Sequence, residues 1–225
     1  MNETLIKEQI CDICMKMWQL GWVASNDGNV SVKLNDRYIL VTPSGISKAF
    51  ITPEKLVKID LNGKIIEANP GCKPSGETRM HLRCYENRDD VGAVVHAHPP
   101  AATAYAVANK PLDEYTVIEA VMSIGSVPVV PYANPSTDEV PEVITPYLQE
   151  HDAMLLKNHG ALTVGTDLLT AFHRMETLEQ FAKISLNVHL LGGAKEIPRE
   201  NIEKLIELRK QYRLTGRHPG YKKYS

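Results

Sequence analysis

Hydrophobic residues recur along this chain at spacings that predict helices separated by short strands. Apolar side chains follow helical spacing from residue 5 to about residue 21, so a first helix is expected there. The same spacing returns several times in the second half of the chain. The further helices that it predicts span residues 77–87, 138–150, 168–191 and 199–212, and an alanine-rich helix begins at about residue 101.

Shorter apolar runs bounded by turn residues predict the strands of a sheet. Asn62-Gly63 is a strong hairpin signal, and Asn35-Asp36 marks a second turn. Strands are expected over residues 29–33, 38–41, 58–61 and 64–67, in a run that ends near residue 97, at 127–131 as a short edge strand, and on both sides of residues 159–160. Hairpins join the early strands and helices connect the later ones, which favours an α/β fold with helices covering a mixed sheet.

Length and charge narrow the classes of protein. The chain has 225 residues and 43% hydrophobic content without a composition break, so we expect a single domain over residues 1–225. Its polar tail from about residue 216 is expected to be mobile unless a neighbour orders it. The formal charge of -2, without a basic stripe, argues against nucleic-acid binding. Because the chain shows neither a secretory signal nor a bilayer-length apolar run, we expect a cytoplasmic protein without a membrane partner.

The cysteines give little sign of chemistry. Four cysteines in a chain of this length, without a framework pattern, fit a reducing compartment. Cys11 and Cys14 have the spacing of a zinc or redox motif, but they lie within the first predicted helix and no second pair accompanies them. We therefore expect ordinary buried thiols.

A His-X-His pair at the end of an apolar strand is the first candidate for chemistry. Side chains alternate along a strand, so His96 and His98 point to the same side, roughly 7 Å apart along the chain. His159 follows a similar strand, and Glu77 opens a predicted helix. Three imidazoles and a carboxylate suit a divalent transition metal, with zinc first on ligand type. His81 is a competing ligand one turn after Glu77, and any one histidine could instead be a hydrogen-bonded core residue.

Three small polar segments predict an anion site. They are Gly28-Asn29-Val30-Ser31, Thr42-Pro43-Ser44-Gly45 and Pro74-Ser75-Gly76-Glu77. Their glycines permit close backbone approach, and their hydroxyl, amide and backbone donors can hold phosphate oxygens. The third also opens a helix, whose free amides favour an anion. The alternative is that they are ordinary turns with an N-cap at Ser75.

These segments, with His96-Ala97-His98 and Lys157-Asn158-His159-Gly160, occur in the order and spacing of a known family. The chain resembles the class II aldolase and epimerase superfamily over nearly its whole length, and within it the L-fuculose-1-phosphate aldolase branch. The resemblance implies a three-layer α/β/α fold with a mixed, mainly antiparallel central sheet. It also implies a cyclic homotetramer with active sites between subunits. The metal would be Zn²⁺, held by Glu77, His96, His98 and His159.

The same resemblance assigns the phosphate-binding residues by position. They are Asn29, Ser44, Gly45, Ser75 and Gly76. Gly76 departs from the serine that is usual in the family, which removes a hydroxyl and leaves the backbone amide.

The implied reaction is cleavage of a short (deoxy)ketose 1-phosphate to dihydroxyacetone phosphate and a small aldehyde. Zinc would stabilise the charge of the enediolate, and Glu77 would carry the proton at the dihydroxyacetone phosphate carbon. In the family a tyrosine from an adjacent subunit handles the proton on the aldehyde oxygen. Tyr212 resembles the family's C-terminal tyrosine and Tyr115 its internal tyrosine, with a surface or interface role as the alternative for each. Strict spacing places the internal family tyrosine at Val117 and not at Tyr115. Glu119 is therefore an alternative for the side of the site that this tyrosine would line.

Other functions stay open from the sequence. Pro135 stands where the family has an aromatic residue beside the aldehyde, so the identity of the ketose is open. The pentulose-5-phosphate 4-epimerases typically have Asp where this chain has Glu77, and the methylthioribulose-1-phosphate dehydratases share the metal ligands. A Schiff-base aldolase would need a desolvated lysine, for which Lys157 is the candidate. A non-enzymatic metal-dependent binding module is the alternative of a different class.

Overall fold

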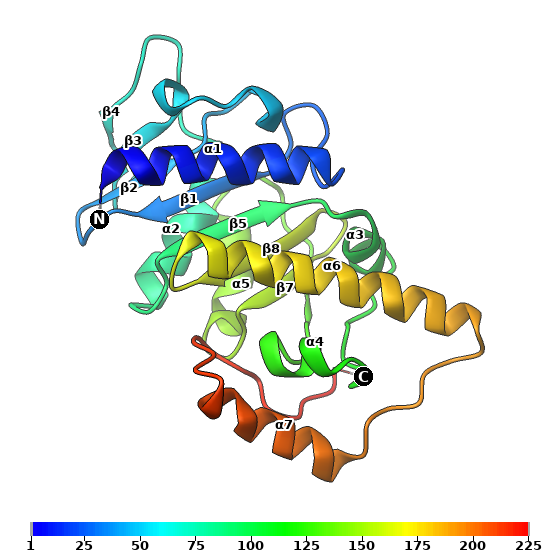
Figure 1. The fold of residues 1–225 in the computed structure, drawn as a ribbon. Helices are drawn as coiled ribbons and strands as arrows, with labels where there is room; N and C mark the ends of the chain where they lie inside the picture. Colours follow the sequence, from blue (N-terminus) through cyan, green and yellow to red (C-terminus); the bar gives the residue numbers. More distant parts are fainter. Residues whose placement is uncertain (1, 225) are drawn as a thin grey trace.

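A computed structural model describes residues 2–224, and its centre is an eight-stranded sheet in the order β4-β3-β2-β1-β5-β8-β7-β6 (Figure 1). The strands are β1 (Asn29–Lys33), β2 (Tyr38–Val41), β3 (Val57–Asp60), β4 (Ile65–Glu67), β5 (Ala93–Ala97), β6 (Val129–Val130), β7 (Ala153–Leu156) and β8 (Gly160–Gly165). The β6–β7 pair is parallel and the other pairs are antiparallel. The prediction of a mixed, mainly antiparallel sheet is confirmed.

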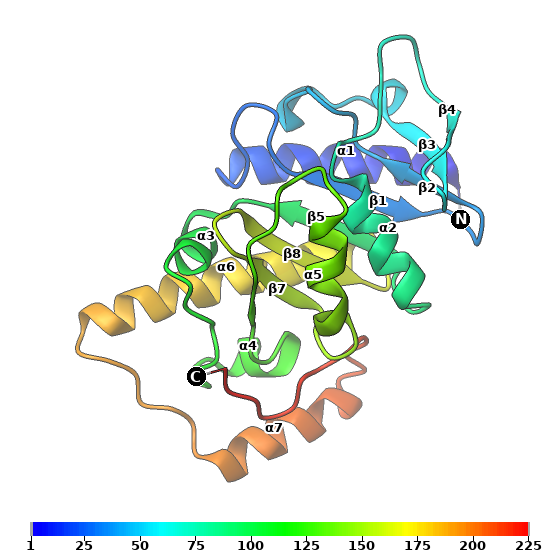
Figure 2. The ribbon, with the colours of Figure 1, turned by 180° about the vertical axis from the view of Figure 1, so that it is seen from behind.

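Helices cover both faces of the sheet. They are α1 (Glu3–Gln19), α2 (Thr78–Asn87), α3 (Pro100–Val107), α4 (Ile118–Ser123), α5 (Glu139–Leu148), α6 (Leu168–Leu190) and α7 (Arg199–Gln211), with short 3-10 helices at Lys48–Phe50 and Pro53–Lys55. Figure 1 shows α1 and α6 on one face, and Figure 2 shows α2 and α5 on the other. A separate buried core lies under each pair, which gives the three-layer arrangement.

Side-chain alternation along β5 explains how one strand serves both cores. Val95 packs in the core under α1 and α6, whereas Val94 packs in the core under α2 and α5. Both faces of β5 are therefore apolar, which is why its sequence reads as a continuous hydrophobic run. His96 has the parity of Val94, so it points toward the side of α2.

The strand register brings distant loops to the end of β5. Asn29 pairs with His96 in the β1–β5 ladder, and Ala97 pairs with Ala161 in the β5–β8 ladder. The residues just outside these pairs, including His98 and His159, therefore gather at one edge of the sheet.

Several elements differ from their predicted form. The helix α4 was not predicted, because six residues are too short to establish helical spacing. The edge strand β6 has only two residues, since prolines flank it and cannot donate to a ladder. Both Cys11 and Cys14 are free thiols within α1. Cys14 is buried as expected and Cys11 is only half-buried, and burial raises the pKa of Cys14 to about 12 and that of Cys11 to about 11.

The polar tail contacts the rest of the fold. Its backbone amide at Tyr224 donates to Asp113 at 2.7 Å, and the Tyr224 hydroxyl lies 2.8 Å from His151 Nε2. Figure 1 shows this segment in red, passing close to α4. Among residues 2–224, no helix combines the length and apolar character required to cross a membrane.

Candidate metal centre

The end of β5, the β7–β8 turn and the start of α2 supply the side chains of the candidate metal centre. His96 is in β5, His98 follows it, His159 lies in the β7–β8 turn and Glu77 immediately precedes α2. Pro99 and Pro100 end the strand and start α3, because proline removes a ladder donor but suits the first turn of a helix. This arrangement leaves His98 just outside the strand, where its side chain is half-buried.

The four side chains converge. The Nε2 atoms of His96 and His98 are 3.2 Å apart. Glu77 Oε2 lies 3.3 Å from His96 Nε2, and Glu77 Oε1 lies 3.2 Å from His159 Nε2. One potential ligand atom from each histidine lies within 4.8 Å of those of the other two. The structure therefore brings together all four side chains that the sequence singled out as metal ligands.

Hydrogen bonds orient the imidazoles. His96 Nδ1 lies 2.9 Å from the carbonyl of Ala161, so this nitrogen donates and Nε2 is left free for a ligand bond. His98 Nδ1 lies 3.5 Å from Asp27 Oδ2. Burial, followed by the charge of His96, lowers the pKa of His98 to about 4 and that of His159 to about 4. Both imidazoles are therefore neutral at pH 7, as metal ligation requires. Burial also acts to lower the pKa of His96, but the Glu77 carboxylate outweighs burial and raises this pKa, so a metal ion would displace a proton from the His96 ring.

The Glu77 carboxylate is prepared for a cation. Burial acts to raise the pKa of this carboxyl, but the imidazoles of His96 and His159 and the Asn29 amide outweigh burial and hold the pKa well below its usual range. Its Oε1 atom is buried without a hydrogen-bond partner. An orphaned carboxylate oxygen facing free imidazole nitrogens fits a divalent metal ion with mixed nitrogen and oxygen ligands.

His81, the competing ligand, has a different position. Its Nε2 lies 2.5 Å from Asn29 Oδ1 and its Nδ1 lies 2.7 Å from Ser31 Oγ. The ring is only 2% exposed, and burial lowers its pKa to about 3. With both nitrogens engaged, His81 orients Asn29, whose Nδ2 donates to Glu77 Oε2 at 2.8 Å.

The three small polar segments lie together beside the cluster. An isolated bridge joins Pro43 to Pro74, and the amide of Ser75 donates to the carbonyl of Thr42 at 3.2 Å. The hydroxyl of Thr42 accepts from the amide of Val30 at 3.1 Å, which ties in the first segment. The adjacent Ser75 hydroxyl accepts a 3.3 Å bond from the backbone of Glu77, so a local capping role is also present.

Lys48 is a charged residue near the site that the sequence did not single out. It is 2% exposed, and its ammonium group donates to the carbonyls of Asn26 and Ile46, each at 3.1 Å. These carbonyls belong to the loops before β1 and after β2, so Lys48 fastens the two loops together. Burial lowers its pKa, with Cys14, Asp27 and Glu77 acting in the opposite direction.

The two tyrosines lie elsewhere in the same chain. Tyr115 is 2% exposed, and its hydroxyl lies 3.0 Å from the carbonyls of both Gly220 and Lys222 in the tail. Tyr212 is 67% exposed at the end of α7. Glu119 is an exposed residue of α4. Figure 1 shows α4 and α7 well separated from the end of β5, so one chain does not join these residues to the metal cluster.

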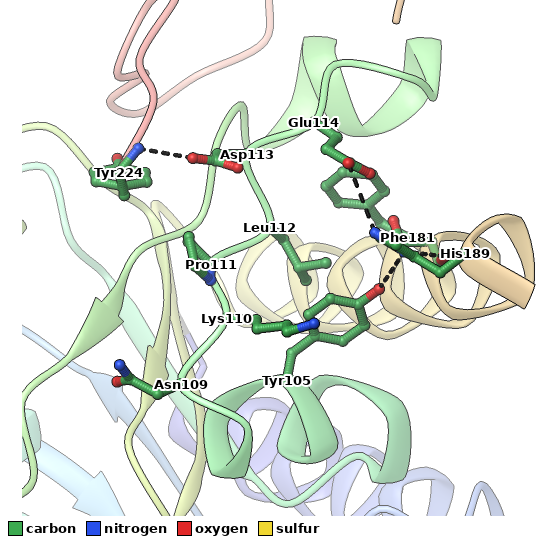
Figure 3. A pocket seen from close by; sticks show the side chains of 11 residues that line it. Tyr105, Asn109, Lys110, Pro111, Leu112, Asp113, Glu114, Phe181, His189 and Tyr224 are labelled. Carbon is green, nitrogen blue, oxygen red and sulfur yellow. Dashed lines mark hydrogen bonds and ion pairs between the residues drawn. The ribbon is translucent and has the colours of Figure 1, made fainter. Parts of the chain in front are cut away.

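A separate hollow of about 380 Å³ lies between the end of α3, residues 109–114 and the end of α6 (Figure 3). Its polar wall includes His189, whose Nε2 is 3.7 Å from Glu114 Oε1 and whose Nδ1 is 3.4 Å from the Tyr105 hydroxyl. None of the four candidate metal ligands lines it. Lys157, the candidate Schiff-base lysine, is only partly buried.

Known proteins resemble this chain in sequence and in structure. The model of the class II aldolase and adducin N-terminal domain matches residues 8–186. An L-fuculose phosphate aldolase of Methanococcus maripaludis is 35% identical over 173 residues, which cover 77% of this chain and 92% of that protein. A 3-oxo-tetronate 4-phosphate decarboxylase of Haemophilus influenzae is 33% identical over 189 residues, covering 82% of this chain and 88% of that protein.

The structural similarity extends further along the chain. A solved L-fuculose 1-phosphate aldolase matches with a TM-score of 0.86 and 31% identity, covering 93% of this chain and 98% of its own. The family model, the relatives and this structure agree with one another and with the resemblance seen in the sequence. The chain therefore belongs to the class II aldolase family of metal-dependent lyases.

Proposed function

We propose that this protein is a zinc-dependent aldolase that cleaves a short (deoxy)ketose 1-phosphate to dihydroxyacetone phosphate and a small aldehyde. The observation that carries the proposal is the convergence of His96, His98 and His159 on the orphaned Glu77 oxygen, beside three small polar loops. Zinc is the metal that best suits these ligands. When bound, it would stabilise the negative charge that develops on the substrate oxygens as the carbon–carbon bond breaks.

In this proposal Glu77 carries the proton at the dihydroxyacetone phosphate carbon. Its low pKa leaves it ionised, and therefore able to accept a proton, at neutral pH. The His81–Asn29 hydrogen bonds support its Oε2 atom from behind, which fixes the direction of the carboxylate. The carboxylate would act as base in the aldol direction and return the proton in cleavage.

The phosphate of the substrate would lie among the three loops. Asn29, Ser44, Gly45, Ser75 and Gly76 are the residues proposed to hold it. The loops are in mutual contact, and a Cβ atom added at Gly45 would meet no atom within 4 Å, so the backbone there is open to a ligand. The buried ammonium group of Lys48 donates to the carbonyl of Ile46, next to Gly45, and so adds positive charge close to this part of the proposed site.

A neighbouring subunit would complete the site. Because Tyr115 and Tyr212 lie away from the metal cluster of their own chain, a role for either in proton transfer to the aldehyde oxygen requires a second copy. We propose a homotetramer with active sites between subunits, which is what the resemblance to the class II aldolases implies, and a cytoplasmic location.

The decisive experiment is a panel of ketose 1-phosphates and pentulose 5-phosphates incubated with the zinc-loaded protein, with products identified by mass and stereochemistry. The proposal requires dihydroxyacetone phosphate and an aldehyde. An epimeric pentulose 5-phosphate without triose phosphate would instead indicate an epimerase, and loss of water a dehydratase.

The panel should also include a phosphorylated 3-oxo acid, because a decarboxylase is 33% identical to this chain. Decarboxylation of a phosphorylated 3-oxo acid also leaves an electron pair on the carbon beside a ketone, so the same charge needs stabilising. Carbon dioxide release from such an acid, with no ketose cleavage, would reassign the reaction. Binding without any turnover across the panel would favour the non-enzymatic module.

A further inference from the structure

Gly76 lacks the hydroxyl that the phosphate site usually has at its position, yet its backbone does not require glycine. Its φ lies outside the positive region that excludes other residues. A Cβ atom added there would meet one neighbour only, at 2.6 Å from Ser136 Oγ and 3.3 Å from Ser136 Cβ. A serine at position 76 and the present Ser136 side chain therefore compete for one space.

We propose that Ser136 supplies, from the loop before α5, the phosphate-binding hydroxyl that Gly76 does not provide. This inference rests on the proposed function, because it assigns a further residue to the proposed phosphate site. The hydroxyl of Ser136 occupies the space that a side chain at position 76 would enter, so it can donate to an anion bound at that position.

The backbone at Ser136 also points to a specific task. Its φ is +62°, in the left-handed region, where a residue with a Cβ atom is strained and glycine is favoured. A serine retained in such a conformation keeps its hydroxyl at some cost in stability. That cost is explained if the hydroxyl binds a ligand.

Neighbouring side chains hold the Ser136 loop against the start of α2. Arg79 of α2 forms a 2.8 Å ion pair with Asp138, and the Glu139 carboxylate accepts the amide of Asn134 at 2.9 Å. The Thr137 hydroxyl donates to the carbonyl of Asn134 at 2.6 Å. The Arg79–Asp138 pair links the loop to α2, and the other two bonds hold residues 134–139 together, so these contacts support the placement of Ser136 beside Gly76.

The test compares Ser136→Ala, Ser136→Gly and the exchange variant Gly76→Ser/Ser136→Gly in the zinc-loaded protein. Affinity for inorganic phosphate and for dihydroxyacetone phosphate is measured by calorimetry, without turnover, and KM and kcat are measured separately. Ser25→Gly is the matched control, because Ser25 is another serine with positive φ, at +48°.

We expect Ser136→Ala and Ser136→Gly to weaken binding of both phosphates about tenfold, the size of one hydrogen bond to a charged group. KM should rise with little change in kcat. The exchange variant should recover affinity to within about threefold, because its hydroxyl returns from position 76. Ser25→Gly should bind as the unmodified protein does.

Two results would overturn the assignment of Ser136. One is unchanged affinity for both phosphates in Ser136→Ala and Ser136→Gly. This holds also if KM for the ketose rises in these variants, because Ser136 would then contact the aldehyde part of the substrate and not the phosphate. The other is an exchange variant that binds no better than Ser136→Gly. If the unmodified protein binds neither phosphate, the proposed phosphate site fails as a whole, and the assignment of Ser136 fails with it.

Discussion

Replacement of Glu77 by glutamine tests the proposed proton transfer with little change of shape. Glu77 Oε2 accepts a 2.8 Å hydrogen bond from Asn29 Nδ2, and a glutamine carbonyl oxygen can keep this bond. Glutamine cannot accept a proton, and it removes the negative charge that faces His96 and His159. The variant therefore separates loss of the base from loss of the surrounding geometry.

The expected size of the effect follows from the state of the carboxylate. The nearby imidazoles hold the Glu77 pKa well below its usual range despite burial, so nearly every molecule has the base available at pH 7. A positioned general base contributes about 10² to 10⁴ in rate. We therefore expect Glu77→Gln to slow proton exchange at least about 100-fold, or by about 2.7 kcal/mol in the barrier.

The assay is exchange of solvent deuterium into dihydroxyacetone phosphate, followed by NMR at saturating zinc, with metal content measured on the same samples. Glu86→Gln is the matched control, since Glu86 is an exposed glutamate of the same helix, α2. If Glu77→Gln retains zinc and exchanges within about threefold of the unmodified protein, Glu77 is not the base.

Three further predictions address the metal cluster, the neighbouring loops and a buried histidine beside the tail. Gly160→Ala should abolish stoichiometric metal binding, because its Cβ atom would lie 2.5 Å from His98 Cδ2; metal analysis checks this, and full occupancy would contradict it. Lys48→Met should lower the free energy of unfolding in urea by about 1–3 kcal/mol, because two loop carbonyls lose their donor. An unchanged urea midpoint would show that the ammonium group does not hold the loops. Burial lowers the pKa of His151 to about 4, so the unfolded chain binds more protons between about pH 4 and 6.5, and stability should fall as pH falls through this window. Urea titrations should show a shallower fall in His151→Gln, and an identical pH slope in both proteins would refute the assignment.

The candidate ligands could be predicted from sequence because the rules involved are local. Strand alternation alone puts His96 and His98 on one side, and the apolar runs before them and before His159 mark two strand ends. Their convergence depends on β5 and β8 being antiparallel neighbours, a pairing that no local pattern specifies. The convergence was predicted instead from the order of the small loops, which this chain shares with a known family.

The residues that position the cluster could not be predicted in the same way. Asp27 and Lys48 act through contacts with residues that are distant in sequence or through unusual burial, and each looks ordinary in its own segment. His81 was visible in the sequence, but as a competing ligand and not as the residue that orients Asn29. Ser136 gives no signal in the sequence, because its relation to Gly76 exists only after α2 and the loop before α5 meet. The sequence showed that Gly76 stands where the family usually has a serine, but it did not show which residue could supply the missing hydroxyl.

The central claim is that the three-histidine cluster holds the metal on which cleavage depends. The most direct test is zinc content measured together with ketose 1-phosphate cleavage in His96→Ala and His98→Ala. His173→Ala is the control, because His173 is an exposed histidine of α6. The account predicts that the first two variants lose stoichiometric zinc and cleavage together while the control keeps both. Full zinc occupancy with undiminished cleavage in His96→Ala and His98→Ala would contradict it.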